Sequence, residues 1–393
     1  MNAPLIPAAI AAEQARHAAW RQDLHAHPEL AYHEHRTADF VADKLASFGL
    51  AVDRGLGRTG VVGTLTQGTG PRRVGLRADM DALPLQELNE FAHRSRHAGC
   101  MHACGHDGHV VMLLAAAEHL ARTRDFDGTV HFIFQPAEEG EAGAKAMMDD
   151  GLFTRFPVDA VFGLHNWPWL PVGQIALRPG PMMAAMDIFE ATLIGRGGHA
   201  AQPHLAVDPV LTAAALVQAW QGIVSRNLDP QEAGVVSVTQ IHAGNAWAVI
   251  PEDVVLRGTV RNFKPEVRAM IERRLREIGE GYAAAHGCRF DLRYEHRFPP
   301  TVNSERETRF AAGVAARLVG EDKVVHDAAP SMGSEDFGWM LQVQRGCYAW
   351  LGSAGRPGCL LHNPYYDFND AVIPLGASYW VNLARDFLAA HAG

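Results

Sequence analysis

Apolar residues in the first 180 positions of the chain recur in two different patterns. Within residues 39–48 they fall at helical spacing and the segment stops at Gly49, which predicts a helix with a glycine C-cap. Residues 110–120 show the same spacing, and Asp107 is the expected N-cap of that helix. Continuous apolar runs predict buried strands at 74–76, 129–135 and 159–164. The alternation of helix and strand predicts an α/β sheet that is covered by helices.

The order of elements changes at the proline-rich segment 178–181 and changes back at residues 299–300. Between them the pattern predicts strand, helix, strand, strand, helix and strand, at residues 186–194, 209–224, 235–241, 254–260, 265–285 and 289–294. This is the order of a ferredoxin-like α+β fold. We therefore expect an inserted domain at residues 183–298, and a larger domain formed by residues 1–182 and 299–393.

Length and charge narrow the possible functions. The 393 residues suffice for two domains, and the net charge of −9 (35 basic against 44 acidic residues) disfavours nucleic acid or an anionic membrane as the main partner. No apolar run is long enough to span a bilayer, and the first residues lack the basic start of a secretory signal. Five cysteines without regular spacing do not suggest a disulfide framework, so we expect a cytoplasmic protein with free thiols.

The strongest chemical signal is the run of residues 101–109, which is dense in histidine. In an extended segment, residues two apart point the same way, so Cys104 and His106 can face one ion, and Gly105 lets the backbone approach closely. A thiolate with an imidazole suits zinc or another borderline transition metal. The alternative, a polar loop with a stray cysteine, explains the run less well.

Several neighbouring polar residues have simpler interpretations. Cys100 and His102 are expected to support the site without binding metal. His109 is expected to lie in the first helical turn, either as a hydrogen-bond donor behind the ligands or at the surface. Ser334 is expected to be a helix N-cap, with the acids 335–336 in the first turn.

Two adjacent carboxylates, Glu138 and Glu139, follow an apolar strand that Pro136 ends. Side chains of neighbouring residues diverge outside a helix, so one carboxylate can bind a metal while the other faces the substrate as a general base. A solvated acidic turn is the alternative, and this motif is informative only together with the others.

Two further histidines lie at or just beyond the ends of apolar strands. His165 closes the strand that begins near residue 159, and His362 follows the strand 347–352 after a short loop. Ligand sites in open α/β sheets lie at the carboxyl ends of strands. Either histidine alone is more simply structural, but their convergence with Cys104 favours a shared site.

Two residues of the inserted segment are candidates for substrate binding. His199 lies in a glycine-rich loop and can offer a hydrogen-bond donor to a developing oxyanion, although a flexible turn explains the loop equally well. Arg261 ends a strand, where it can hold a carboxylate through two hydrogen bonds, or can simply be a surface arginine.

Together these motifs resemble the metal-dependent aminoacylase and carboxypeptidase superfamily. The resemblance is to the amidohydrolase branch with hippurate hydrolases and plant hydrolases of indole-acetyl amino-acid conjugates. It spans nearly the whole chain, at residues 25–30, 76–84, 101–109, 135–140, 198–204, 334–337 and 361–364.

The resemblance implies an N-acyl amino-acid hydrolase with two divalent ions per subunit, zinc or manganese, with cobalt or nickel as alternatives. It implies a zinc-peptidase-like catalytic domain with a mixed, mainly parallel sheet, and an inserted domain that often makes a homodimer. Glu138 matches the family's general base, His199 a carbonyl-polarising histidine and Arg261 a carboxylate-binding position. The implied metal ligands are Cys104, His106, Glu139, His165 and His362.

The chain departs from the family pattern at two places. Relatives outside this branch carry a metal-binding histidine where Arg77 stands, which leaves the role of Asp79 open. Relatives usually have an asparagine where this chain has Ala248, and Asn245 is no obvious replacement, so the amino-acid preference stays open.

The resulting hypothesis is hydrolysis of an amide by an activated water, with Glu138 taking the proton and passing it to the leaving amine. A dipeptidase or carboxypeptidase with the same site is the alternative. A structural metal site is disfavoured, because such sites are closed and rich in cysteine. A phosphoesterase is disfavoured, because it would place more positive charge near the site.

Overall fold

The computed structural model describes residues 6–355 and 357–389, and the chain divides into two compact units. The first unit combines residues from Met1–Met182, Thr301–Ala329 and Asp336–Gly393. The second combines Met183–Pro300 with Pro330–Glu335. Both units therefore contain segments that are distant in the sequence.

The first unit is built on a mixed sheet with the strand order β1-β2-β4-β3-β5-β16-β6-β15. The neighbouring strands β4, β3, β5 and β16 run parallel to one another. The pairs β1–β2, β2–β4 and β16–β6 are antiparallel. Central strands such as β5 are buried along nearly their whole length, as strands covered on both faces must be. The strands are β1 Ala51–Leu56, β2 Gly60–Gln67, β3 Arg73–Asp79, β4 Gly128–Gln135, β5 Ala160–Trp167, β6 Ile175–Ala176, β15 Val324–Val325 and β16 Gly346–Gly352.

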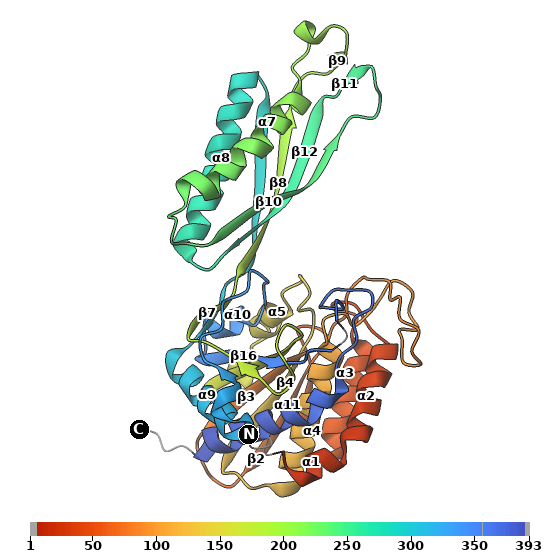
Figure 1. Ribbon diagram of the computed structural model, residues 1–393, viewed down its shortest axis with the longest axis vertical. Helices are drawn as coiled ribbons and strands as arrows, with labels where there is room; N and C mark the ends of the chain where they lie inside the picture. The colour runs from red at the N-terminus through yellow and green to blue at the C-terminus, as the bar shows by residue number, and fades with distance from the viewer. Residues whose placement is uncertain (1–5, 356, 390–393) are drawn as a thin grey trace. The chain divides into compact units, whose positions relative to one another are not determined.

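Helices flank this sheet, as Figure 1 shows. Helix α4 (His106–Thr123) is apolar nearly all round and packs against β3, α2 and α11, so it is buried in the core. The other helices around the sheet are α1 Ala8–Ala12, α2 Gln14–Ala26, α3 His35–Ser47, α5 Gly143–Asp149, α6 Leu152–Arg155, α9 Glu305–Val319, α10 Gly338–Leu341 and α11 Ile373–Ala389. The predicted α/β architecture with a mainly parallel central sheet is confirmed.

The second unit has an antiparallel sheet with the order β10-β12-β8-β13. Helices α7 and α8 lie side by side on one face of this sheet (Figure 1). The elements follow the chain as β8 Ala185–Ile194, α7 Pro209–Gly222, β10 Gly234–Ala243, β12 Asp253–Asn262, α8 Pro265–His286 and β13 Arg289–Phe298. Both the sequence order and the strand order are ferredoxin-like.

Two predicted helix caps are wrong. Asp107 lies inside the first turn of α4, and the N-cap is Gly105, because the helix begins four residues earlier than the apolar spacing suggests. Ser334 is not an N-cap either, since α10 begins at Gly338 with Phe337 as its N-cap. Among the described helices, none is both long and apolar enough to cross a membrane.

Candidate metal centre

The loop before α4 brings Cys104 and His106 to the carboxyl ends of the parallel strands. Gly105 between them has φ 92°, a left-handed conformation that favours glycine. A Cβ atom at this position would lie 2.4 Å from Oδ1 of Asn166. Glycine is therefore required where the backbone passes Asn166. The segment is not extended as predicted, because Gly105 is left-handed and His106 begins α4.

His165 lies near the end of β5 and presents one ring nitrogen to Cys104. Its Nδ1 donates to the carbonyl oxygen of Asn166 (2.7 Å), and its Nε2 lies 3.4 Å from Sγ of Cys104. Burial, together with the neighbouring His109, holds the pKa of His165 well below its usual value. A neutral imidazole with its lone pair on Nε2 is the form that binds a metal.

Glu138 and Glu139 follow β4 in a turn. Glu138, Glu139 and His106 place one potential ligand atom each within 4.8 Å of one another. Glu138 is buried at 7% relative exposure, and its Oε1 accepts a long hydrogen bond from the backbone of Asp336 (3.4 Å). Both carboxylates therefore lie next to His106.

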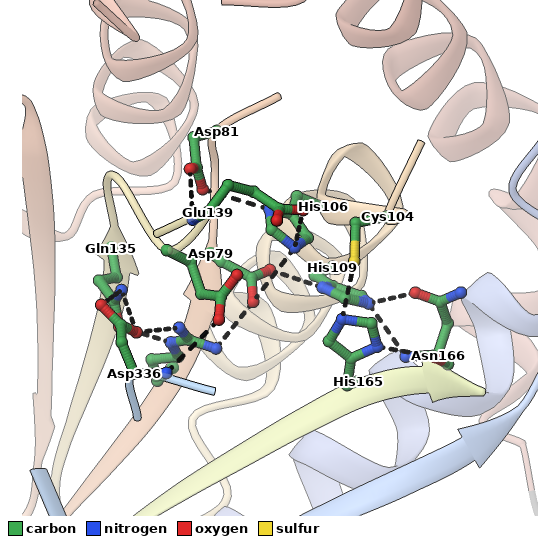
Figure 2. Close-up of polar contacts among 12 residues, drawn as sticks. Asp79, Asp81, Cys104, His106, His109, Gln135, Glu139, His165, Asn166 and Asp336 are labelled. Atoms are coloured by element: carbon green, nitrogen blue, oxygen red, sulfur yellow. Dashed lines mark hydrogen bonds and ion pairs between the residues drawn. The ribbon is translucent and has the colours of Figure 1, made fainter. Parts of the chain in front are cut away.

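His362 reaches the same place from the loop after β16. Its backbone has φ 61°, and its N–H donates to the carbonyl oxygen of Ala103 (2.7 Å). Its Nε2 lies 3.4 Å from Oε1 of Glu139, and Cys104, Glu139 and His362 form one compact group of potential ligands. The structure thus brings all five expected ligands together, although they come from four separate segments of the chain (Cys104, His106, Glu139 and His165 are labelled in Figure 2).

Two buried atoms in this cluster make no hydrogen bond within the described part of the chain. They are Nε2 of His106 and Oε1 of Glu139, which face each other at 4.0 Å. Buried polar atoms are normally paired, so an unpaired donor and acceptor in one place call for a missing partner. A divalent cation fits, because thiolate, imidazole and carboxylate are the donors of zinc and related metals.

The electrostatics of Cys104 and His106 reflect the carboxylates around them. Burial raises the pKa of the Cys104 thiol well above its usual value, and Glu139 and Glu138 raise it further. Burial alone would lower the pKa of His106, but Asp79 and Asp81 outweigh it and raise the pKa to about 10. In the metal-free protein both side chains thus hold a proton at neutral pH, and a bound cation would displace these protons.

A second layer of polar residues supports the ligands, and Figure 2 shows how it surrounds them. Nδ1 of His109 donates to Oδ1 of Asp79 (2.6 Å), and Nε2 of His109 lies 2.6 Å from Oδ1 of Asn166. His109 is buried, which supports the interpretation as a donor behind the ligands and contradicts the surface alternative. The role of Asp79 is not predicted by the sequence patterns, although Asp79 ends β3, at the edge of the sheet where the ligands were expected.

Arg77, which stands where other branches carry a metal ligand, is fully buried in an ion-pair network. It donates to Asp79 (2.7 Å), to Gln135 (2.7 Å) and to Asp336 (3.1 Å). Burial opposes ionisation of Asp79, but His106, Arg77 and His109 together hold the pKa of Asp79 well below its usual range. Asp336 is thus an internal counter-ion of Arg77. It precedes α10 and does not lie in the first helical turn, contrary to the prediction.

His199 and Arg261 both belong to the second unit. His199 is exposed in β9 (Gly198–His199), and its Nδ1 accepts from the N–H of Ala201 (3.1 Å), which leaves the ring proton on Nε2. The carbonyl of Ala248 accepts from the N–H of Ala200 (2.9 Å), so Ala248 adjoins the His199 loop. Arg261 donates to Oγ of Ser334 (2.6 Å).

Comparison with known proteins identifies similar chains over most of the length. Residues 75–386 match the family described as Peptidase family M20/M25/M40. A hippurate hydrolase of Campylobacter jejuni is 42% identical over 94% of this chain and 95% of its own. An IAA-amino acid hydrolase of Arabidopsis thaliana is 40% identical over 94% of this chain and 84% of its own.

A solved structure agrees with these sequence matches. The crystal structure of a Bacillus subtilis protein, described as a dinuclear metal binding peptidase, superposes with a TM-score of 0.83 at 33% identity. The match covers 96% of this chain and 99% of that chain. The similarity thus includes both units and the segments that carry the metal cluster.

Proposed function

The chain belongs to peptidase family M20/M25/M40, and we propose that it is a metal-dependent amidohydrolase that cleaves N-acyl amino acids to a carboxylic acid and a free amino acid. The observation that carries the proposal is the cluster of five donors with two unpaired buried atoms, beside a further carboxylate on Glu138. A closed structural site would have no use for this additional carboxylate.

We propose that two divalent ions, zinc or manganese with cobalt or nickel as alternatives, are held by the five donors. When bound, such ions lower the pKa of a water to about 7 and polarise the carbonyl that is attacked. The proposed ligands are Cys104, His106, Glu139, His165 and His362. Their mixture of sulfur, nitrogen and oxygen donors supports a transition metal over magnesium or calcium.

Glu138 is the proposed general base. Its carboxylate takes one proton from water as the oxygen attacks the amide carbon, and the same carboxyl group passes this proton to the leaving nitrogen as the C–N bond breaks. Its position in the turn beside Glu139 supports this role, because a carboxylate oxygen of Glu138 lies within 4.8 Å of potential ligand atoms of both His106 and Glu139.

His199 and Arg261 are the proposed substrate-binding residues. The proton on Nε2 of His199 can be donated to the oxygen that becomes negative during the attack. The guanidinium of Arg261 carries several donors beyond the one that Ser334 accepts, so it can hold the carboxylate of an amino-acid product.

The substrate class is supported by the two named relatives, which act on hippurate and on IAA–amino acid conjugates. Both compounds join an aromatic acyl group to an amino acid. The alternative is a dipeptidase or carboxypeptidase that uses the same site, which the likeness to a dinuclear metal binding peptidase favours.

We further propose that residues 183–298 act as a lid and dimerisation domain, between the catalytic segments 1–182 and 299–393, and that the protein is a cytoplasmic homodimer or higher homo-oligomer. Light scattering of the purified protein gives its mass in solution, and a monomer would contradict this part of the proposal.

The test of the function is hydrolysis of benzoyl-glycine by metal-free protein, with and without added manganese or zinc, followed as released glycine. Turnover that appears only with metal supports the proposal. Indole-acetyl amino acids, N-acetyl amino acids and dipeptides measured in parallel separate the alternatives. A protein that binds two metals and cleaves only dipeptides would be a dipeptidase, and one that cleaves none of these would overturn the proposal.

A further inference from the structure

Two buried carboxylates that are not among the proposed ligands contact the turn that carries Glu138 and Glu139. Oε1 of Glu34 accepts from the N–H of Ala137 (2.8 Å), and Oδ2 of Asp81 accepts from the N–H of Glu139 (2.9 Å). Glu34 and Asp81 are at most 1% exposed, so neither can touch a substrate. Their contacts lie on either side of Glu138 in the sequence.

The turn needs such support because Ala137 has an unfavourable backbone. Its φ of 54° is left-handed, which costs an L-amino acid other than glycine about 1–2 kcal/mol. A left-handed residue persists where surrounding contacts fix it, and such residues gather at functional sites. Glu34 supplies the contact, and its other oxygen is held in turn by the hydroxyl of Thr59 (2.6 Å).

Asp81 contacts a second ligand as well. Its Oδ1 lies 3.2 Å from Nδ1 of His106, and Figure 2 shows Asp81 beside both His106 and Glu139. A carboxylate has no proton to donate, so the proton of this contact belongs to Nδ1 of His106. Because Nδ1 keeps its proton in this contact, Nε2 is the ring nitrogen that remains to bind a cation, and it is the buried atom without a hydrogen bond.

We propose that Glu34 and Asp81 are positioning residues of the metal centre. Glu34 fixes the left-handed turn that carries Glu138 and Glu139. Asp81 holds the backbone of Glu139 through Oδ2 and sets the tautomer of His106 through Oδ1. The inference deepens the proposed function and rests on it, because it assumes that His106 and Glu139 bind metal. Such partners behind metal ligands typically affect metal affinity or activity by about 10–100-fold.

A side-chain amide can preserve the hydrogen bonds of Glu34 but not those of Asp81. At position 34, glutamine keeps an oxygen for the N–H of Ala137, and its NH₂ group can donate to the hydroxyl of Thr59, which is able to accept. At position 81 both partners are donors, so the NH₂ group of asparagine must face one of them. It either repels the N–H of Glu139 or forces the proton of His106 onto Nε2.

The experiment measures metal affinity by titrating metal-free protein against a chelator, with kcat and KM as separate readouts. We expect Asp81→Asn and Glu34→Ala to weaken metal binding and to lower kcat by about 10–100-fold each, with KM little changed. Glu34→Gln should stay close to wild type. Asp81→Asn should be at least as harmful as Asp81→Ala, although asparagine has the shape of aspartate.

Matched controls make the same chemical change elsewhere. Glu29→Gln alters a carboxylate that accepts from the N–H groups of Arg36 and Thr37, and Asp127→Asn alters one that accepts from Thr69 and Gly70. Both should leave metal affinity unchanged.

If Glu34→Ala fails to fold, the variant that also carries Ala137→Gly remains informative, because glycine adopts a left-handed φ without cost. The second change should restore part of the metal affinity, and no recovery would count against the role of Glu34.

Wild-type metal affinity in folded Asp81→Asn would overturn the role of Asp81, and equal damage from Glu34→Gln and Glu34→Ala would overturn that of Glu34. These results need no substrate, so they differ from failure of the proposed function, in which metal is bound but no amide is cleaved.

Discussion

The sulfur of Cys104 lies 3.4 Å from Nε2 of His165, although 61 residues separate them in the chain. Cys104 precedes α4, whereas His165 lies near the end of β5, so the contact exists because helix and strand both terminate at one edge of the sheet. Both side chains are buried, and Nδ1 of His165 is held by the carbonyl oxygen of Asn166. Two potential metal donors from distant segments of the chain thus face each other.

Replacement of Glu138 by glutamine separates chemistry from metal binding. The amide cannot take a proton from water, so kcat should fall by about 10²–10⁴-fold, while the metal content should stay normal because Glu138 is not a proposed ligand. Steady-state kinetics and elemental analysis of the same preparation test this. Glu141→Gln, an exposed acid in the same loop, should change neither quantity. A Glu138→Gln variant that keeps most of its turnover would remove Glu138 from the mechanism.

Removal of the His362 side chain tests the most exposed of the proposed ligands. The side chain is 55% exposed and lies in a loop, so His362→Ala should fold normally but bind fewer metal ions per subunit. Elemental analysis after dialysis gives the stoichiometry. His326→Ala removes a surface histidine of similar exposure, 48%, and should retain the full complement. If His362→Ala also retains it, His362 is not a ligand.

The elements that the sequence predicted well are those with strong local signals. Helix α8 was expected at residues 265–285 and is found at Pro265–His286, because Pro265 marks its first turn and the left-handed Gly287 ends it. Alternating and continuous apolar runs likewise fixed the strands, and the convergence of strand ends indicated where the donors meet.

The features that could not be predicted from the sequence are the start of α4 and the contacts between distant segments. The N-cap assigned to Asp107 was wrong because α4 begins at His106, inside the metal loop, where the apolar spacing gives no signal. The pairing of Glu34 with Ala137 spans 103 residues, and the role of Asp336 as counter-ion of Arg77 spans 259. No local sequence pattern predicts such pairs, so the residues that support the metal ligands can be identified only from the three-dimensional structure.

Metal affinity should rise with pH. In the metal-free protein the raised pKa of Cys104 and the pKa of about 10 for His106 mean that both hold a proton at neutral pH, and a cation must displace these protons. The logarithm of the affinity should therefore rise by on the order of one unit per pH unit for each displaced proton.

Calorimetric titration in buffers of different ionisation enthalpy counts the released protons. Cys104→Ser should reduce the count, whereas Cys100→Ser, which alters a buried cysteine outside the described metal cluster, should not. An affinity that is independent of pH would contradict the assignment of Cys104 and His106 as ligands.

Stability at acid pH should depend on His131, a buried histidine in β4. Burial, together with the nearby Arg73, lowers the pKa of His131 to about 4, and its Nδ1 contacts the hydroxyl of Thr64 (2.9 Å). The folded-state pKa is thus depressed below the usual value of 6.5, so the unfolded chain takes up a proton that the folded chain refuses. The contribution of neutral His131 to the unfolding free energy is lost as the pH falls from 6.5 towards 4, and it is fully present above 6.5.

Between pH 7 and pH 4.5, wild type should lose on the order of 2 kcal/mol more unfolding free energy than His131→Gln. Urea unfolding in the presence of a chelator measures this difference, and His35→Gln, which alters an exposed histidine, should behave as wild type. Parallel pH profiles for wild type and His131→Gln would show that His131 is not the group responsible.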